Sequence, residues 1–268
     1  MDGLKFLSLS SGSSGNCYFL GNTDEGILID AGISARKINK TLKEHGIDLG
    51  IIKGLCISHD HSDHIIAAGY IGERCGIPVY ATRETIGGMN RNFRMPEKIY
   101  TSHRFIVKGT PFKIGNFEIT AFDVMHDGSD NSGFVIRHGD ICIAFATDIG
   151  CLTPEVKRLL KKADYIVLES NYDDNMLKTG RYPEFLKRRI AGNNGHLCNS
   201  DAAEFIAEAF EEGVSKAFLC HISAENNSPD IAFDCVCKSL AKRGFNEERF
   251  ADVIPLARTK ASPVFILK

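Results

Sequence analysis

The most informative stretch of this chain is His59-Asp60-His61-Ser62-Asp63-His64, which has the pattern H-x-H-x-D-H. His59 and His61 are two positions apart in an extended segment, so their imidazole rings project to the same side. Asp63 and His64 open the helix that follows and turn toward a second point. Neutral imidazole and carboxylate groups are suitable ligands for zinc, manganese or iron. The segment therefore predicts two ligands for each of two neighbouring metal ions.

Further ligands are expected where other apolar runs end. The C-terminal ends of strands gather at one edge of a sheet, and sites of α/β folds lie at such edges. Five apolar runs that we interpret as strands are each followed or closed by a polar residue: Asp30, His126, Asp148, Glu169 and His221. We expect these five side chains to lie beside the H-x-H-x-D-H segment.

Short β-rich runs alternate with helical patterns along the rest of the chain. Strands are expected at 4–9, 17–20, 26–29, 54–58, 78–81, 112–124, 133–147, 165–168, 216–220 and 264–267. Helices are expected at 34–45, 63–75, 83–91, 154–162, 182–191, 200–212 and 229–243. The ranges 112–124 and 133–147 each indicate a hairpin, because Gly115-Asn116 and Gly139 interrupt them. We expect two sheets with helices outside, in a single domain over residues 1–268.

Composition excludes several classes of protein. Of 268 residues, 43% are apolar and 25% are charged, as in ordinary globular chains. The longest apolar run, Ile141–Ala146, is far shorter than the roughly 20 residues that cross a membrane. The first residues lack a basic start and a long apolar stretch, so no secretory signal is expected. The nine cysteines, an odd number without C-x-x-C, indicate a reduced, cytoplasmic protein.

The charge balance limits how a nucleic acid could be held. The formal net charge is −2, from 32 Lys and Arg against 34 Asp and Glu, so only a local patch could bind phosphates. Two basic clusters are candidates, although each also fits a solvated helix face. They are Lys178, Arg181, Lys187, Arg188 and Arg189, and Lys157, Arg158, Lys161 and Lys162.

The H-x-H-x-D-H segment and the polar strand ends together resemble the metallo-β-lactamase superfamily, and the resemblance covers nearly the whole chain. It implies an αββα four-layer sandwich, an α/β fold with two mixed sheets and two metal ions at one edge. The implied ligands are His59, His61 and His126 for one ion, Asp63, His64 and His221 for the other, and Asp148 for both. Asp30, in LIDAG, would support the histidine loop from behind the ligands.

The segment Gly195-His196-Leu197-Cys198-Asn199-Ser200-Asp201-Ala202-Ala203 resembles ribonuclease Z and its relatives. There the matching histidine contacts the scissile phosphate and protonates the leaving oxygen, paired with a carboxylate that matches Glu169. The resemblance therefore implies that His196 is a proton donor, although a cap on the helix that follows is the alternative. Asp63, besides binding metal, would orient a hydroxide that bridges the two ions.

A narrower resemblance rests on SLSSGSSGNCYFL, LIDAGIS, ISHDHSDHI, LESNYDDNMLKTGRYPEFLKRRI, GHLCNSDAA and CHIS. These segments are similar to the bacterial YycJ/WalJ family of cytoplasmic metal-dependent nucleases, which digest double-stranded DNA from 5′ to 3′. Tyr172 departs from the family, because many relatives have histidine there. The resemblance implies a DNA exonuclease with two divalent ions, zinc, manganese or iron. Its oligomeric state stays open.

Substrate contacts are expected at two places. The loop 10–16 could offer Ser13 and Asn16 to a phosphate, although serine and glycine are ordinary turn residues. Four basic residues that follow Glu169 are predicted to contact the DNA backbone: Arg181, Lys187, Arg188 and Arg189.

Three other functions remain open at the level of the sequence. One is a small-molecule phosphodiesterase or another hydrolase of the same fold. Another is an oxidoreductase with one iron and a sulfur substrate. The third is a non-catalytic binding protein, against which the complete ligand set argues.

Overall fold

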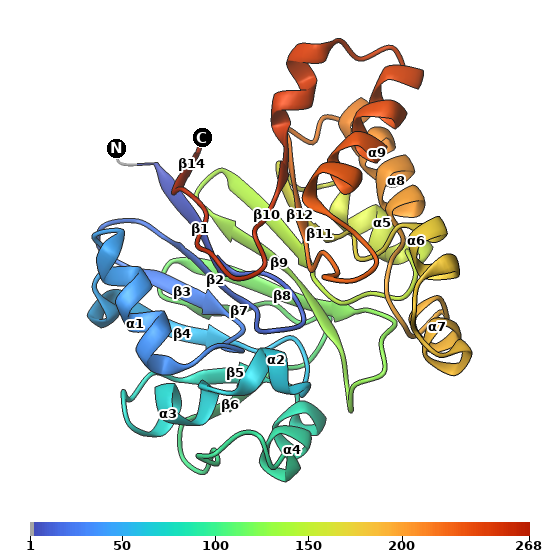
Figure 1. Ribbon diagram of the computed structural model, residues 1–268. Helices are drawn as coiled ribbons and strands as arrows, with labels where there is room; N and C mark the ends of the chain where they lie inside the picture. Colours follow the sequence, from blue (N-terminus) through green and yellow to red (C-terminus); the bar gives the residue numbers. More distant parts are fainter. Residues whose placement is uncertain (1–2) are drawn as a thin grey trace.

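Two mixed sheets of seven strands each face one another in the computed structural model, which describes residues 3–268 (Figure 1). The first sheet has the order β14-β1-β2-β3-β4-β5-β6. Its strands are β1 (Leu4–Ser10), β2 (Cys17–Gly21), β3 (Gly26–Ile29), β4 (Ile52–Cys56), β5 (Val79–Ala81), β6 (His103–Phe105) and β14 (Phe265–Leu267). The second sheet has the order β13-β12-β11-β10-β9-β8-β7. Its strands are β7 (Phe112–Ile114), β8 (Phe117–Asp123), β9 (Ser132–His138), β10 (Ile141–Ala146), β11 (Tyr165–Glu169), β12 (Lys216–Cys220) and β13 (Val253–Pro255).

Helices cover the outer face of each sheet (Figure 1). Those beside the first sheet are α1 (Ala35–Glu44), α2 (Ser62–Ile65), α3 (Ala68–Glu73) and α4 (Arg83–Arg91). Those beside the second are α5 (Pro154–Leu160), α6 (Asp174–Thr179), α7 (Glu184–Ile190), α8 (Asn199–Glu211) and α9 (Pro229–Lys242). Short 3₁₀ turns occupy Leu49–Ile51 and Glu247–Asp252. Within residues 3–268, every helix is too short or too polar to cross a bilayer.

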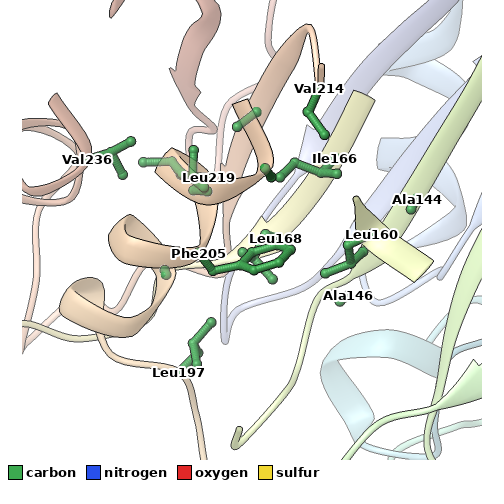
Figure 2. Packing of buried hydrophobic residues seen from close by; sticks show 14 of the residues in the cluster. Ala144, Ala146, Leu160, Ile166, Leu168, Leu197, Phe205, Val214, Leu219 and Val236 are labelled. Atoms are coloured by element: carbon green, nitrogen blue, oxygen red, sulfur yellow. The ribbon is translucent and has the colours of Figure 1, made fainter. Parts of the chain in front are cut away.

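Side chains alternate between the two faces of each strand, and this alternation builds three apolar layers. In β1, Phe6 points between the sheets, where its ring centroid lies 4.6 Å from that of Phe218, whereas Leu7 faces the helices. Full burial of such a ring stabilises the fold by about 1.5–3 kcal/mol. Figure 2 shows the outer layer of the second sheet, where Phe205 of α8 lies beside Leu168 of β11. The expected αββα sandwich is confirmed.

The helix expected at 63–75 is interrupted, and the interruption serves the candidate site. α2 ends at Ile65 and α3 begins at Ala68. Between them, the N–H of Ala67 leaves the helical pattern and donates to the carbonyl of Ala31, 2.9 Å away. Ala31 in turn donates to the carbonyl of His64 at 2.7 Å. The segment that carries H-x-H-x-D-H is thereby fastened to the end of the neighbouring strand β3.

The sequence does not predict three short elements, β6, β13 and α6. The two strands have three residues each, which is too few to show an alternation of apolar and polar positions. α6 buries only Leu177, which leaves no helical stripe to detect. The remaining expected elements are present with ends shifted by at most two residues, as for 54–58, which is observed as Ile52–Cys56.

Candidate metal centre

The candidate ligands meet at one edge of the two sheets, each carried there by the C-terminal end of a strand. Asp30 follows β3 and the H-x-H-x-D-H segment follows β4, while the other residues lie at or beyond the ends of β8, β10, β11 and β12. Among the described residues, Asp30 (φ 59°) and His221 (φ 51°) are the only non-glycine residues with positive φ. Such backbone costs of order 1–3 kcal/mol and is concentrated at functional sites. Its occurrence at two residues of this edge points to a functional site there.

Four overlapping groups of three or four side chains have potential ligand atoms within 4.8 Å of one another, and two of these groups are the ones that the resemblance implies. We call His59, His61 and His126 the outer set, and Asp63, His64 and His221 the inner set. Asp148, which is 4% exposed, lies between them. Its Oδ1 is 3.8 Å from Nε2 of His126, and its Oδ2 is 3.1 Å from Nε2 of His64. Oδ1 also lies 3.5 Å from Nδ1 of His221, so Asp148 lies beside both sets.

In the inner set, buried carboxylates determine which ring nitrogen carries the proton. Nδ1 of His64 lies 2.7 Å from Oδ2 of Asp30, and Nδ1 of His221 lies 2.9 Å from Oε1 of Glu169. Since an ionised carboxylate only accepts hydrogen bonds, both Nδ1 atoms are donors. In the neutral rings Nε2 then keeps its lone pair. Both Nε2 atoms point toward Asp63 Oδ2, at 3.6 and 3.5 Å.

The outer set is oriented by weaker acceptors. Nδ1 of His126 donates to the carbonyl of Gly195 at 2.8 Å, so its Nε2 is free. Ser58 Oγ donates to Asp30 and lies 3.0 Å from Nδ1 of His59, from which it accepts. His61 is turned the other way. Its Nε2 lies 3.4 Å from Oδ1 of Asp127, and its Nδ1 faces Nε2 of His126 at 3.3 Å.

The nitrogen and oxygen atoms that meet here are suitable ligands for divalent cations. Nε2 of His59 and Oδ2 of Asp148 are buried and make no hydrogen bond. Oδ2 of Asp148 is close to Nε2 of His64, but that nitrogen is an acceptor when Nδ1 serves Asp30 and already receives the amide of Asn16 at 2.9 Å, so it offers no proton to Oδ2. A buried acceptor without a donor is unfavourable, and a cation satisfies several at once. Imidazole nitrogens and carboxylate oxygens are the donor types that zinc, manganese and iron accept.

The neighbouring charged groups and burial also determine the pKa values of the candidate site. Burial raises the pKa of Asp148, but His221 and His64 outweigh it and hold that pKa well below its ordinary value. Burial, together with His64, lowers the pKa of His59 well below its ordinary range, which favours the neutral ring that binds metal. Burial also lowers the pKa of His196, but Glu169 outweighs it and raises that pKa. Burial likewise lowers the pKa of His64 and of His221, but Asp148 outweighs it and raises both. The edge thus combines an ionised carboxylate and a neutral imidazole with imidazoles that favour their protonated form.

Glu169 is fully buried and links His196 to the inner set. Its Oε1 lies 2.7 Å from Nδ1 of His196 and 2.9 Å from Nδ1 of His221. Its Oε2 accepts the backbone N–H groups of Ile149 and Leu197 at 2.9 and 3.1 Å. These donors stabilise the carboxylate and fix its orientation. The side chain of His196 keeps 23% of its surface exposed, so it is accessible from solvent.

The sequence analysis misses three residues of this site: Ser58, whose contacts with Asp30 and His59 are given above, Asn171 and Asp127. Nδ2 of Asn171 donates to Oε1 of Glu169 at 3.1 Å and to the carbonyl of His221 at 2.9 Å. Asp127 bridges Nε2 of His61 and the guanidinium of Arg189, whose Nε and Nη2 both lie 2.7 Å from Oδ2. The available signal was adjacency, because Asp127 follows His126 and Asn171 lies two residues after Glu169.

Of the loop residues predicted to contact substrate, the structure corrects Asn16. Asn16 is fully buried. Its Oδ1 accepts from the N–H of Gly12 at 2.8 Å, and its Nδ2 lies 2.9 Å from Nε2 of His64 and within 3.4 Å of Asp63 Oδ2. With no surface to offer a phosphate, the amide instead supports the inner set. Ser13, in the same loop, is exposed.

The four basic residues predicted to contact DNA differ in their exposure and in their bonding partners. Arg181 and Arg188 are exposed, whereas Lys187 donates to the carbonyl of Lys178 at 2.7 Å. Arg189 is held by Asp127 at the rim of the outer set. Tyr172, where relatives often have histidine, is buried in a small apolar cluster with Leu177 and Cys198.

Comparison with known proteins agrees with this geometry. Residues 25–222 match the family described as Beta-lactamase superfamily domain. This chain belongs to the metallo-β-lactamase superfamily. It is 33% identical to Exodeoxyribonuclease YycJ of Bacillus anthracis over 91% of both chains, and 32% identical to Exodeoxyribonuclease WalJ of Streptococcus pneumoniae over 90% of this chain and 89% of the relative. The resemblance to the YycJ/WalJ family is thereby confirmed.

A solved structure extends the comparison within the superfamily. Human tRNase Z, short form, aligns with a TM-score of 0.65 over 98% of this chain and 100% of that chain. The two sequences are 15% identical, so the likeness shows a shared fold.

Proposed function

We propose that this chain is a metal-dependent nuclease that hydrolyses DNA from the 5′ end at a centre of two divalent ions. The proposal rests chiefly on the unpartnered donor atoms of His59 and Asp148, buried among five other candidate ligands. The relatives named exodeoxyribonucleases support DNA as the substrate. The 5′-to-3′ direction rests on the resemblance to the YycJ/WalJ family.

The ligands divide between two ions in this proposal. The outer set would hold one ion, the inner set would hold the other, and Asp148 would contact both. Bound zinc, manganese or iron would lower the pKa of a water molecule and polarise the phosphoryl oxygen. The buried supports Asp30, Ser58 and Glu169 keep the histidine rings in the orientation that this requires.

Asp63 orients the attacking water in this proposal. Its carboxylate is 21% exposed and is thus the most accessible member of the inner set. Asn16 and His221 approach Oδ2, which leaves Oδ1 as an acceptor for the water. A fixed acceptor of this kind restricts the approach of a nucleophile to one direction.

His196 supplies the proton to the leaving oxygen. Glu169 holds Nδ1 of His196 at 2.7 Å, so Nε2 is the nitrogen that faces the substrate. In the protonated ring Nε2 donates both a hydrogen bond to the phosphate and the proton that the departing oxygen requires. Glu169 remains ionised throughout, because backbone N–H groups fix its other oxygen.

A gel assay tests the proposal. Purified protein with Mn²⁺ is incubated with double-stranded DNA labelled at either end, beside His61→Ala and a matched His45→Ala control. His45 ends α1 and contacts the carbonyl of Thr41, outside the ligand sets. We expect progressive loss from the 5′ end with wild type and His45→Ala, and intact DNA with His61→Ala. If wild type with two bound ions leaves DNA intact but cleaves a small phosphodiester, the nuclease proposal fails.

A further inference from the structure

Phe93 is the most exposed large apolar side chain of the described residues, with 88% of its surface accessible. It lies in the segment Arg91-Asn92-Phe93-Arg94, which ends α4 and which we call the α4 tip. A single exposed ring is ordinary on a protein surface. The anchoring of this ring, its position and the charges beside it distinguish it from the others.

The backbone on both sides of Phe93 is firmly held. Oδ1 of Asn92 accepts the N–H of Arg94 at 3.0 Å, and the carbonyl of Asn92 accepts the N–H of Met95 at 3.2 Å. Nζ of Lys98 donates to the carbonyls of Asn92 and Met95 at 2.6 and 2.7 Å. Met95 itself is fully buried. The ring of Phe93 is therefore presented to solvent by a fixed turn.

The α4 tip is attached directly to the loop of candidate ligands. Nδ2 of Asn92 donates to the carbonyl of Asp60 at 3.0 Å, and Asp60 stands between His59 and His61. α4 also packs closely on this loop, because a Cβ at Gly88 would lie 1.8 Å from Oδ2 of Asp60. Phe93 is thus next in sequence to a residue that is bonded to the loop of candidate ligands.

The charges of the α4 tip are unpaired. Arg91 and Arg94 are exposed, and within residues 3–268 neither guanidinium contacts a carboxylate. The guanidinium of Arg189, by contrast, is paired with the carboxylate of Asp127. The exposed ring of Phe105 is covered by Arg83, whose guanidinium carbon lies 4.2 Å from the ring centroid. The tip thus carries an exposed aromatic ring and two free cations within four residues.

We propose that the α4 tip binds the end of the DNA substrate, with Phe93 stacking on an unpaired base. Arg91 and Arg94 contact the adjoining phosphates. The inference rests on the proposed nuclease function. Every base has a π face, so an aromatic ring binds an unpaired base whatever its identity, as an exonuclease that meets every sequence requires. The ring also replaces the stacking that a terminal base loses when it leaves the duplex.

The absence of tryptophan from the chain permits a direct test. Phe93→Trp introduces a single indole at the tip, and Tyr100→Trp introduces one at another exposed aromatic position, which is 72% accessible. Each Mn²⁺-loaded variant is titrated with a phosphorothioate-protected duplex that has a single-stranded 5′ end. Stacking quenches indole fluorescence, so we expect saturable quenching for Phe93→Trp and none for Tyr100→Trp.

Affinity and salt dependence separate the ring from the charges. Phe93→Ala should raise the Kd for this duplex roughly 5- to 150-fold, as the loss of one stacked base predicts, while Phe93→Tyr restores binding. Phe93→Ala should keep the slope of log Kd against log salt, whereas Arg94→Ala should reduce it by about one. The metal content of Phe93→Ala after gel filtration should equal that of wild type, as expected for a ring that is 88% exposed.

The outcomes distinguish this inference from the proposed function. Degradation of unprotected DNA by wild type without quenching in Phe93→Trp would overturn the role of the α4 tip alone. Quenching by DNA that the wild type does not degrade would support the tip and contradict the nuclease function. A metal content of Phe93→Ala below that of wild type would also overturn the inference, because it would indicate damage to the metal centre.

Discussion

The inner and outer sets of candidate ligands contain similar side chains but are supported in different ways. His64 and His221 of the inner set donate to Asp30 and Glu169, both of which are 0% exposed. The outer set relies on the hydroxyl of Ser58, the carbonyl of Gly195 and Asp127. The side chain of Asp127 is 30% exposed and is shared with Arg189.

This difference in support predicts a difference in the affinity of the two sets for a metal ion. A buried carboxylate acts in a medium of low dielectric constant, so its attraction for the donated proton is strong and is little screened by salt. It also increases the basicity of the histidine that it supports. An exposed carboxylate or a neutral acceptor contributes less. We therefore expect the inner ion to be held more tightly and the outer ion to leave first when a chelator is added.

The largest effect is expected from Asp148→Asn, because Asp148 is the residue that both sets share. The change keeps the shape of the side chain but removes the negative charge between His64 and His126. Hydrolysis of DNA and of bis(p-nitrophenyl) phosphate should fall to the level of wild type treated with chelator. Metal content after gel filtration should fall below that of wild type, while circular dichroism shows a folded chain. Full activity in a folded, metal-loaded variant would refute the shared role.

His196→Ala should lower kcat for DNA by about 10²–10⁴-fold, the usual contribution of a positioned acid. Its metal content should not change, because His196 belongs to neither set of candidate ligands; Glu169 and a ring contact with His221 at 5.3 Å connect it to the inner set. Glu169→Gln provides the comparison, since it should lower both kcat and the affinity of the inner ion. If His196→Ala also loses metal, the separation between proton donor and ligand support is wrong.

Asp30→Asn should weaken binding of the inner ion by about 10–100-fold, the range found when the partner of a metal-bound histidine is removed. The amide cannot accept equally from His64 and Ser58, which the carboxylate serves together. Competition with a chromogenic chelator would measure each affinity. An unchanged inner affinity would show that burial of the carboxylate has no bearing on metal binding.

Asp127→Asn should have the smallest effect, a loss of about fivefold or less in the affinity of the outer ion, in line with exposed ion pairs. Arg189→Ala should change that affinity by a similar amount, because Arg189 acts on His61 only through Asp127. The same chelator assay measures both. Should Asp127→Asn cost as much as Asp30→Asn, burial would not be what separates the two sets.

Much of the candidate site follows from local sequence. His59, His61, Asp63 and His64 lie within six residues, and Asp30, Asp148 and His221 each follow an apolar run that forms a strand. Parallel and mixed sheets bring the ends of such strands to one edge, so one chain pattern predicts both the fold and the neighbourhood of the ligands. The sandwich could be predicted for the same reason, since alternating apolar runs need a surface on both faces.

The supports of the ligands depend on contacts between residues far apart in the chain. Asn16 is 47 residues from Asp63, and Asp127 is 62 residues from Arg189. No spacing rule predicts that Asn16 is buried beneath the inner set or that Arg189 is held by a carboxylate rather than free. The short strands β6 and β13 escape prediction because pairing at a sheet edge, and not their composition, makes them strands.

The sequence by itself determined the types of ligand, their order along the chain and the edge at which they meet, because these depend on strand period and local spacing. Only the tertiary structure decided which nitrogen of each imidazole faces the centre. That choice depends on an acceptor from another element, such as Asp30 for His64 or Gly195 for His126. The tertiary structure also decided that the carboxylates supporting the inner set are buried, whereas Asp127, which supports the outer set, is partly exposed. Burial is a property of the packed layers and cannot be assigned to a residue in isolation.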